Sequence, residues 1–179
     1  SIAAAIFSAA PLITETSPPI GLSATTSIFP NIIFISRSHF LDIYDKPNLN
    51  YQTVDILQCL SRAVDFATTL TDIKPQIINE SYDSTFFGDA LLIEEVLINL
   101  LNNAADAITQ KNSGDGAIRI EIWNEYKWLC LSVRDNGTGI SRKNKRKIFK
   151  PFFSTKHSLT GWGVGLCYSK NIINAHGGY

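Results

Sequence analysis

The spacing of hydrophobic positions predicts three helices in the second and larger part of the chain. Apolar residues recur at helical spacing from Ile56 to Ala67, and Asp55 stands near the start of that pattern. The segment 90–108 consists mostly of Leu, Ile, Val and Ala and predicts a longer helix. A third helix is predicted over 163–175, and a cluster of glycines lies at its start.

Strand patterns lie between these helices. Residues 76–79 predict a short strand, and residues 117–123 alternate isoleucine with polar residues, as a half-buried strand does. After a predicted turn at 124–127, residues 128–133 alternate again and form a natural hairpin partner. Because this clearest strand pair is antiparallel, the mixture of elements favours an α+β sandwich over a doubly wound sheet.

The first 50 residues follow no such pattern. Residues 1–36 carry a single charge, Glu15, and prolines interrupt them after an Ala- and Ile-rich stretch, 1–10, that could form a short helix. Residues 46–50 have the composition of a linker. We therefore divide the chain into an N-terminal segment and linker, 1–50, and a folded domain, 51–179.

Composition narrows the class of protein. The chain has 179 residues, of which 45% are hydrophobic and 18% charged, and this excludes a disordered protein. Its three cysteines are too few and too scattered to indicate a disulfide framework or a zinc site, which favours a reducing compartment. No uncharged run is both long and apolar enough to span a bilayer.

Charge is unevenly distributed, although the formal net charge is zero. Residues 1–133 hold seven basic and 15 acidic residues, a net charge of −8, whereas residues 134–179 hold nine basic residues and only Asp135, a net charge of +8. Six of the basic residues lie within 141–150, and 141–148 is a candidate basic helix. Such a patch could contact nucleic-acid phosphates, but aromatic residues barely interleave, so a solvated basic helix is the preferred interpretation.

A polar stripe marks the longest predicted helix. Glu95, Asn99, Asn103 and Asp106 follow one another at spacings of 4, 4 and 3, so they lie on one face. The stripe could be the solvated face of an amphipathic helix. It could instead line a cleft, where an Asn carbonyl oxygen can bind Mg²⁺, an ion that prefers oxygen ligands.

Two glycine-containing segments follow. Asp135–Ile140 places a carboxylate and two glycines directly after a predicted strand, where the carboxylate could accept from an amine of a purine, or simply begin a turn. Gly161–Leu166 opens the last predicted helix, where backbone N–H groups could approach phosphate oxygens. Its G-x-G-x-G spacing matches neither the dinucleotide fingerprint nor a P-loop, and a hinge without ligand is the alternative.

Between these segments, Phe149–Phe153 holds three phenylalanines around a proline, which could be core or a motif of its own. The four motifs in this order resemble the catalytic, ATP-binding domain of sensor histidine kinases, within the ATPase superfamily that includes gyrase and mismatch-repair ATPases. In that resemblance Glu95–Ala104 is similar to the N box, Asp135–Gly139 to the G1 box, Phe149–Phe153 to the F box and Gly161–Leu166 to the G2 box. It covers roughly residues 50–179.

The resemblance implies a Bergerat-type two-layer sandwich with a mixed sheet, and it implies a role for each matching residue. Asn103 would bind Mg²⁺, Asn99 would lie on the triphosphate side, and Glu95 would hold water or metal contacts. Asp135 would accept from the adenine amino group, which Gly137 and Gly139 would allow to approach. The residues expected to frame or contact the phosphates are Lys156, Gly161, Gly163, Val164, Gly165 and Leu166, with 157–160 in a mobile lid.

The same resemblance implies a protein-histidine kinase that transfers the γ-phosphate of ATP to a histidine on a dimerisation domain, with a response regulator as the next acceptor. It also implies that the full-length protein is a homodimer, that this domain is cytoplasmic, and that the parent protein could be anchored to a membrane. The segment 1–50 could be a remnant of the dimerisation helices. Alternatives are a nucleotide-binding regulatory fragment without phosphotransfer and the basic-patch nucleic-acid binder.

The chain departs from the family pattern at three places. Asp106 stands where many relatives have a basic residue. His39 is followed by Phe40 rather than by an acidic residue, so we interpret it as structural or solvent-exposed and leave open that the phosphoacceptor precedes Ser1. The sequence stops where the family continues with a terminal β-hairpin, which predicts a bare sheet edge.

Overall fold

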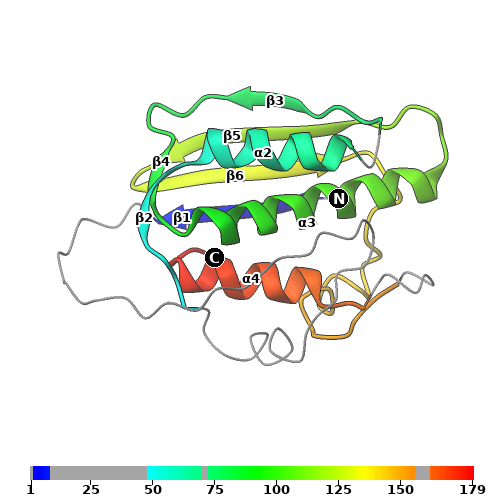
Figure 1. The fold of residues 1–179 in the computed structure, drawn as a ribbon. Helices are drawn as coiled ribbons and strands as arrows, with labels where there is room; N and C mark the ends of the chain where they lie inside the picture. The colour runs from blue at the N-terminus through cyan, green and yellow to red at the C-terminus, as the bar shows by residue number, and fades with distance from the viewer. Residues whose placement is uncertain (1, 9–47, 70–71, 156–161) are drawn as a thin grey trace.

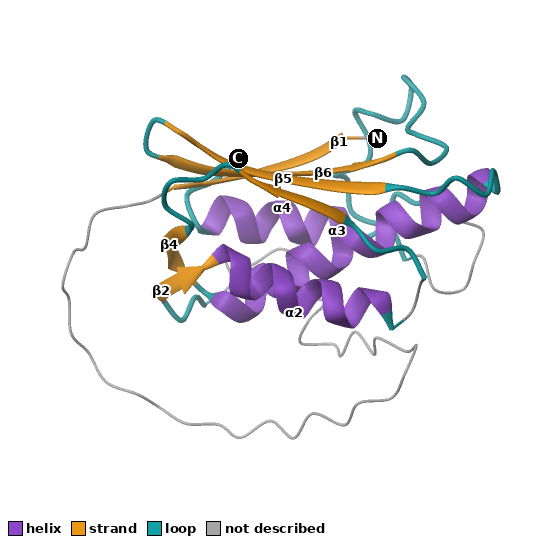
Figure 2. Ribbon diagram, turned by 90° about the horizontal axis from the view of Figure 1, so that it is seen from above, coloured by secondary structure: helices purple, strands orange, loops and turns teal. Residues whose placement is uncertain are grey.

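The computed structural model describes residues 2–8, 48–69, 72–155 and 162–179, with only the backbone of 2–8 described. These residues form two layers, a mixed sheet and three helices that cover one of its faces (Figures 1 and 2). The strands are β1 (Ile2–Ser8), β2 (Gln52–Asp55), β3 (Gln76–Asn79), β4 (Thr85–Gly88), β5 (Ile118–Glu125) and β6 (Trp128–Asp135). The helices are α2 (Ile56–Thr68), α3 (Ala90–Lys111) and α4 (Gly165–Ala175).

The main sheet has the strand order β1-β6-β5-β3. β5 and β6 form the predicted antiparallel hairpin, with Ile120 opposite Val133, whereas β3 pairs with β5 in parallel. A separate two-stranded sheet joins β2 to β4. The predicted α+β sandwich with a mixed sheet is therefore confirmed.

Both long helices begin where the sequence supplies an N-cap. The Asp55 side chain accepts a hydrogen bond of 3.0 Å from the backbone N–H of Leu57 at the start of α2. The Asp89 side chain accepts from the backbone N–H groups of Leu91 and Leu92 at the start of α3. An aspartate at this position satisfies helix N–H groups that have no partner within the helix.

The core lies between the sheet and the helices. Alternate residues of β5 and β6 point into it, and the apolar faces of α2 and α3 meet them. The fully buried side chains with less than 2% exposure include Ile56, Leu60, Ile93, Leu97, Ile120, Ile122, Leu129, Leu131 and Ile172. This packing fixes α3 over the middle of the sheet, so its remaining face is left to meet α4.

The N-terminal stretch differs from its prediction. Residues 2–8 form strand β1 rather than a short helix, and β1 pairs antiparallel with β6 from Ile2 opposite Arg134 to Ser8 opposite Trp128. β1 therefore covers the edge of β6, and β1 is itself an edge strand of the described sheet. Alanine has the highest helix propensity, but propensity is a weak determinant of structure, and the unpaired backbone groups of an adjacent strand can override it. His39 lies outside the described residues.

The basic segment also differs from its prediction. Residues 142–149 form successive turns and not a continuous helix. Isolated bonds join Lys145 N to Ser141 O and Ile148 N to Asn144 O. Like charges at helical i, i+4 spacing, as between Arg142 and Arg146, destabilise a helix, and the segment has no apolar stripe to bury.

Candidate functional site

The predicted polar stripe lies along one face of α3. Asn99 and Asn103 are partly buried, and Glu95 and Asp106 are exposed. The Asn103 Nδ2 atom donates to Asn99 Oδ1 at 3.3 Å, which joins the two amides along the helix. The stripe therefore consists of two linked amides with an exposed carboxylate on either side, and it is not a uniformly solvated face.

The start of α4 lies directly against Asn99. The Asn99 Nδ2 atom donates to the buried Ser169 Oγ at 2.8 Å. A Cβ atom added to Gly165 would stand 2.3 Å from Asn99 Oδ1, closer than any side chain permits. Only a glycine allows this approach, so Gly165 brings the first turn of α4 onto the amide stripe. Val164, the N-cap residue, makes no side-chain capping bond.

The first turn of α4 gives the site its electrostatic character. The leading N–H groups of a helix have no partner within it and carry a partial positive charge that favours anions. Here these groups belong to an 11-residue helix whose start is packed beside Asn99. An anionic group can therefore meet backbone N–H groups from α4 and amides from α3 at one place.

The loop after β6 packs against the other end of the stripe. Asp135 Oδ1 accepts from the Gly137 N–H at 3.0 Å, which orients the carboxylate. A Cβ atom on Gly137 would meet the backbone carbon of Ala107 at 2.4 Å, and the Thr138 N–H donates to Ala107 O at 3.0 Å. Ala107 lies one turn beyond Asn103, so Asp135 is brought to the far end of the amide pair.

A second pair of contacts steadies this loop. The Asn136 side chain accepts from Ala117 N at 2.9 Å and donates to Asp115 O at 2.7 Å, while Lys111 Nζ donates to the Asn136 carbonyl oxygen at 2.9 Å. Gly139 has a φ of +70°, a conformation that glycine adopts without strain. The loop is therefore held from both sides at its start, next to Asp135.

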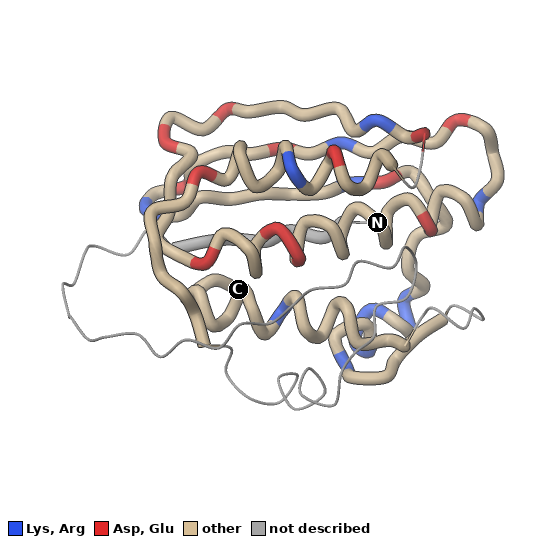
Figure 3. Tube along the Cα trace, viewed as in Figure 1, with Lys and Arg blue, Asp and Glu red and all other residues tan. Residues whose placement is uncertain are grey.

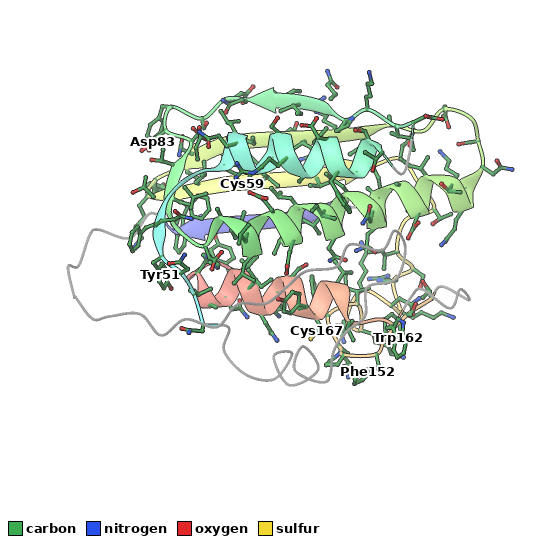
Figure 4. The ribbon with its side chains drawn as sticks, viewed as in Figure 1. Tyr51, Cys59, Asp83, Phe152, Trp162 and Cys167 are labelled. Atoms are coloured by element: carbon green, nitrogen blue, oxygen red, sulfur yellow. The ribbon has the colours of Figure 1, made fainter. Side chains whose placement is uncertain are left out.

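The phenylalanine motif contacts the glycine motif. A Cβ atom on Gly163, whose φ is +69°, would meet the Phe153 carbonyl oxygen at 2.6 Å. Phe149 and Phe152 are 45% and 49% exposed, so this motif is not simply core. Figure 4 shows Phe152 and Trp162 at the end of α4 where the helix begins. The structure thus brings the described parts of all four predicted motifs to one region around α3 and α4.

The donor atoms of this region fit Mg²⁺ only as an ion that is also bound by phosphate oxygens of a ligand. Among the described residues, no group of three or more His, Cys, Asp or Glu side chains is placed to hold a metal. Mg²⁺ keeps several waters and commonly takes one or two protein oxygens together with phosphate oxygens. An amide oxygen such as that of Asn103 suits that arrangement, so the residues present fit an ion that arrives with a nucleotide.

The three cysteines are not candidates for catalytic residues. All three cysteines are free and buried. Burial is the main cause that raises the pKa of each thiol, to about 11 for Cys59, and Glu94 adds to the effect there. A thiol must be deprotonated to act as a nucleophile, so Cys59, Cys130 and Cys167 are packing residues.

The motifs do not supply every residue of the site. Lys156, Gly161 and the predicted lid at 157–160 lie outside the described residues. Ser169 and Ala107 were not predicted. Ser169 follows Gly165 by one helical turn, and a serine at that place in an apolar helix was the available signal. The contact at Ala107 is made by its backbone, so the residue type at this position gives no indication of it.

Comparison with known proteins identifies this arrangement. The family described as histidine kinase-, DNA gyrase B-, and HSP90-like ATPase matches residues 88–179. The chain belongs to this family of ATPases. Residues 88–179 contain all four motifs, so the ATPase domain of the chain accounts for the site. None of the helices among the described residues is long and apolar enough to cross a membrane.

Sensor kinases are the relatives of this ATPase domain. The histidine-protein kinase AtoS of Escherichia coli is 45% identical over 92 residues, which are 51% of this chain and 14% of AtoS. The sensor histidine kinase FlgS of Helicobacter pylori is 37% identical over 135 residues, which are 74% of this chain and 34% of FlgS. The chain thus spans about a third or less of the length of these relatives, and its ATPase domain is of the sensor histidine kinase type.

Solved structures agree on the fold. The catalytic domain of histidine kinase ThkA is 28% identical with a TM-score of 0.58, and the match covers 71% of this chain and 82% of that one. Full-length ShkA, solved in complex with AMPPNP, has a TM-score of 0.64 at 21% identity, and the match covers 78% of this chain and 29% of ShkA. The expected histidine-kinase ATPase fold is confirmed by these neighbours.

Proposed function

We propose that this chain binds ATP together with Mg²⁺ across the face where α3 meets α4, and that it does so as part of a two-component sensor kinase. The observation that carries the proposal is the convergence of the amide stripe, the first turn of α4 and the Asp135 loop. These three features supply groups for metal-bound phosphate, for phosphate oxygens and for a purine amine, respectively. Membership of the ATPase family supports the same assignment.

In this proposal each residue has a stated task. Asp135 accepts from the adenine amino group, and Gly137 and Gly139 leave room for the base. Asn103 provides an oxygen to Mg²⁺, with Asn99 beside it and Glu95 orienting water. Gly163, Val164, Gly165 and Leu166 present the start of α4 to the phosphates. Lys156 and Gly161 would complete the phosphate contacts. Bound Mg²⁺ would neutralise phosphate charge.

Charge near the site supports a polyanionic ligand. The exposed basic residues of 142–150 follow the Asp135 loop and gather beside the start of α4 (Figure 3). They form no ion pair with another described residue. A concentration of one sign of charge beside a binding site attracts the oppositely charged ligand and raises its association rate.

We propose protein-histidine kinase activity for the complete protein. The γ-phosphate would pass to a histidine of a dimerisation domain and then to an aspartate of a response regulator, and the full-length protein would be a homodimer. The domain would act in the cytoplasm, where ATP is available, whether or not the parent protein is anchored to a membrane. The sensor-kinase relatives support this assignment. A nucleotide-binding regulatory fragment without phosphotransfer is the alternative, and a nucleic-acid binder the second.

Calorimetric titration with a non-hydrolysable ATP analogue tests nucleotide binding. We expect binding that needs Mg²⁺ and that weakens by about tenfold or more in Asp135→Asn, because the amide presents an N–H group to the purine amine. Asp65→Asn, an exposed aspartate of α2, is the matched control. If the wild-type chain does not bind, or Asp135→Asn binds equally well, the assignment of the adenine site is wrong.

Incubation with radiolabelled ATP and a separate dimerisation-domain helix pair tests phosphotransfer. An acid-labile label on the histidine of the added domain would support kinase activity. Analogue binding without any label on that domain would favour the regulatory fragment. Binding of DNA or RNA that weakens steeply with salt would instead support the nucleic-acid alternative.

A further inference from the structure

His176 occupies a buried position at the end of α4 where both of its ring nitrogens are hydrogen-bonded. His176 is 6% exposed. Nδ1 lies 2.7 Å from the Ile172 carbonyl oxygen, and Nε2 lies 2.9 Å from the Asp89 backbone nitrogen. A carbonyl can only accept and a backbone N–H can only donate, so the ring must be neutral with its proton on Nδ1.

The partner of His176 is the residue that begins α3. Asp89 caps α3 through Oδ1, and its Oδ2 accepts from the Asn50 N–H at 3.0 Å. Asp89 is itself buried, at 8% exposure. One hydrogen bond to His176 therefore ties the end of α4 to the capped start of α3, at a place where the entering chain is attached as well.

Aromatic side chains surround the contact between His176 and Asp89, which we call the joint. Phe86 meets the His176 ring edge-on with centroids 6.4 Å apart, and the Tyr51 hydroxyl donates to the Ala175 carbonyl oxygen at 3.1 Å. A Cβ atom on Gly88 would stand 2.6 Å from the imidazole. Figure 4 shows Tyr51 at the end of α4 opposite to Phe152 and Trp162. The imidazole is thus enclosed, with little room to reorient.

The joint and the proposed nucleotide site are two attachment points on the same pair of helices. At the joint, His176 of α4 meets Asp89 of α3, and at the site Ser169 of α4 meets Asn99 of α3. At about 1.5 Å per residue, these points are roughly 10 Å apart along α4 and roughly 15 Å apart along α3. Two hydrogen bonds at separate points along α4 restrict its sliding and rotation over α3 more than one would, in addition to the packing of the buried Ile172.

We propose that His176 is a positioning residue for nucleotide binding, which holds the first turn of α4 in register with Asn99 through its bond to Asp89. The proposal rests on the proposed nucleotide site, because the register matters only if a ligand spans α3 and α4. Loss of the bond would remove one of the hydrogen bonds that tie α4 to the α3 side of the fold and would widen the range of positions open to its phosphate-facing N–H groups.

Two substitutions at His176 separate positioning from packing. His176→Phe keeps a ring of similar shape and removes both hydrogen bonds, while His176→Gln keeps an acceptor and a donor at a similar separation. We expect His176→Phe to weaken binding of an ATP analogue by about fivefold to tenfold, and His176→Gln to recover most of the loss. Ile120→Val, a core change in β5, controls for lowered stability alone.

The wild-type chain provides a measurement that needs no variant. The Asp89 amide donates its proton to His176 Nε2. This proton should exchange with solvent about fivefold to tenfold more slowly when the analogue is bound, because coupling between the joint and the nucleotide site is reciprocal. The Glu80 amide, bonded to Ile122 O at 2.8 Å in the sheet, is the control for the general stabilisation that any ligand gives, and its exchange should slow by less than that of the Asp89 amide.

These measurements decide the proposal. Wild-type affinity in a folded His176→Phe chain, or unchanged Asp89 exchange on binding, would overturn it. If His176→Phe does not fold, Asp89 exchange alone gives the decision. If His176→Phe weakens binding no more than Ile120→Val does, His176 serves stability only. Absence of analogue binding by the wild-type chain would refute the proposed function itself, which is a different result.

Discussion

Substitution of Gly137 by alanine tests how the Asp135 loop is held. An added Cβ would stand 2.4 Å from the Ala107 backbone carbon and 2.6 Å from its oxygen, where ordinary contact begins at 3.4 Å. The loop or α3 must therefore move by about 1 Å, and the backbone of a packed helix cannot move at little cost. Gly137 does not have a positive φ, so the effect is steric.

The size of the effect follows from two contributions. Forcing one extra methyl group into a packed contact costs about 1–3 kcal/mol, and losing the bond from Thr138 N to Ala107 O costs about another 1 kcal/mol. If the loop moves instead, Asp135 is displaced by about 1 Å, a shift that can reduce binding of an aligned ligand by about 10- to 100-fold. Either outcome is measurable.

Chemical unfolding and calorimetric titration with an ATP analogue would be measured on the same preparations. Gly114→Ala is the control, because Gly114 has a φ of +75°, nothing within 4 Å of its added Cβ and no place in the site. It should lose about 1 kcal/mol through backbone strain and keep its affinity. Unchanged stability together with unchanged affinity in Gly137→Ala would show that the contact with α3 does not hold the loop.

Four further outcomes follow from the structure. Ser169→Ala should lower the free energy of unfolding by about 1 kcal/mol in denaturant titrations and weaken analogue binding, because Asn99 loses its partner. Stability against urea should fall as pH rises from the thiol value of 9.0 in the unfolded chain towards about 11 in the folded one, since the unfolded chain ionises first, and Cys59→Ala should flatten that fall. Charge-neutralising substitutions across 142–150 should slow analogue association in stopped-flow measurements and reduce its dependence on salt. Deletion of residues 1–10 should expose the β6 edge and increase aggregation seen by light scattering.

Sequence patterns predicted the elements that build their own hydrophobic face. The β5–β6 hairpin and the long α3 each repeat an apolar position at the period of their structure, so their positions were predictable to within a few residues. The segment 2–8 has no such period. It forms a strand because it pairs with the edge of β6, which lies more than 100 residues away in the sequence. Local composition cannot indicate a partner at that distance.

The site was predictable to a similar and limited degree. Asn99, Asn103 and Asp135 are unusual residues for their local settings, and an unusual residue is visible in a sequence. The contacts that bring them together are not, because Gly137 packs on a backbone and Gly165 on an amide from another element. Ser169 looks like an ordinary residue of a helix until the fold gives it a partner, Asn99, on α3.

The distribution of charge explains how an acidic helix can serve a polyanionic ligand. Glu95 and Asp106 are exposed at either end of the amide stripe and would repel a triphosphate. The first turn of α4 and the turns of 142–150 would oppose that repulsion, since basic residues gather beside the start of α4 in Figure 3. A divalent cation bound between the phosphates and the amide stripe would reverse the sign of the field there, since an ion is the largest charge in such a site. The acidic residues of α3 then favour the metal-bound nucleotide over the free one, so affinity in the absence of Mg²⁺ should rise when Asp106 is replaced by asparagine.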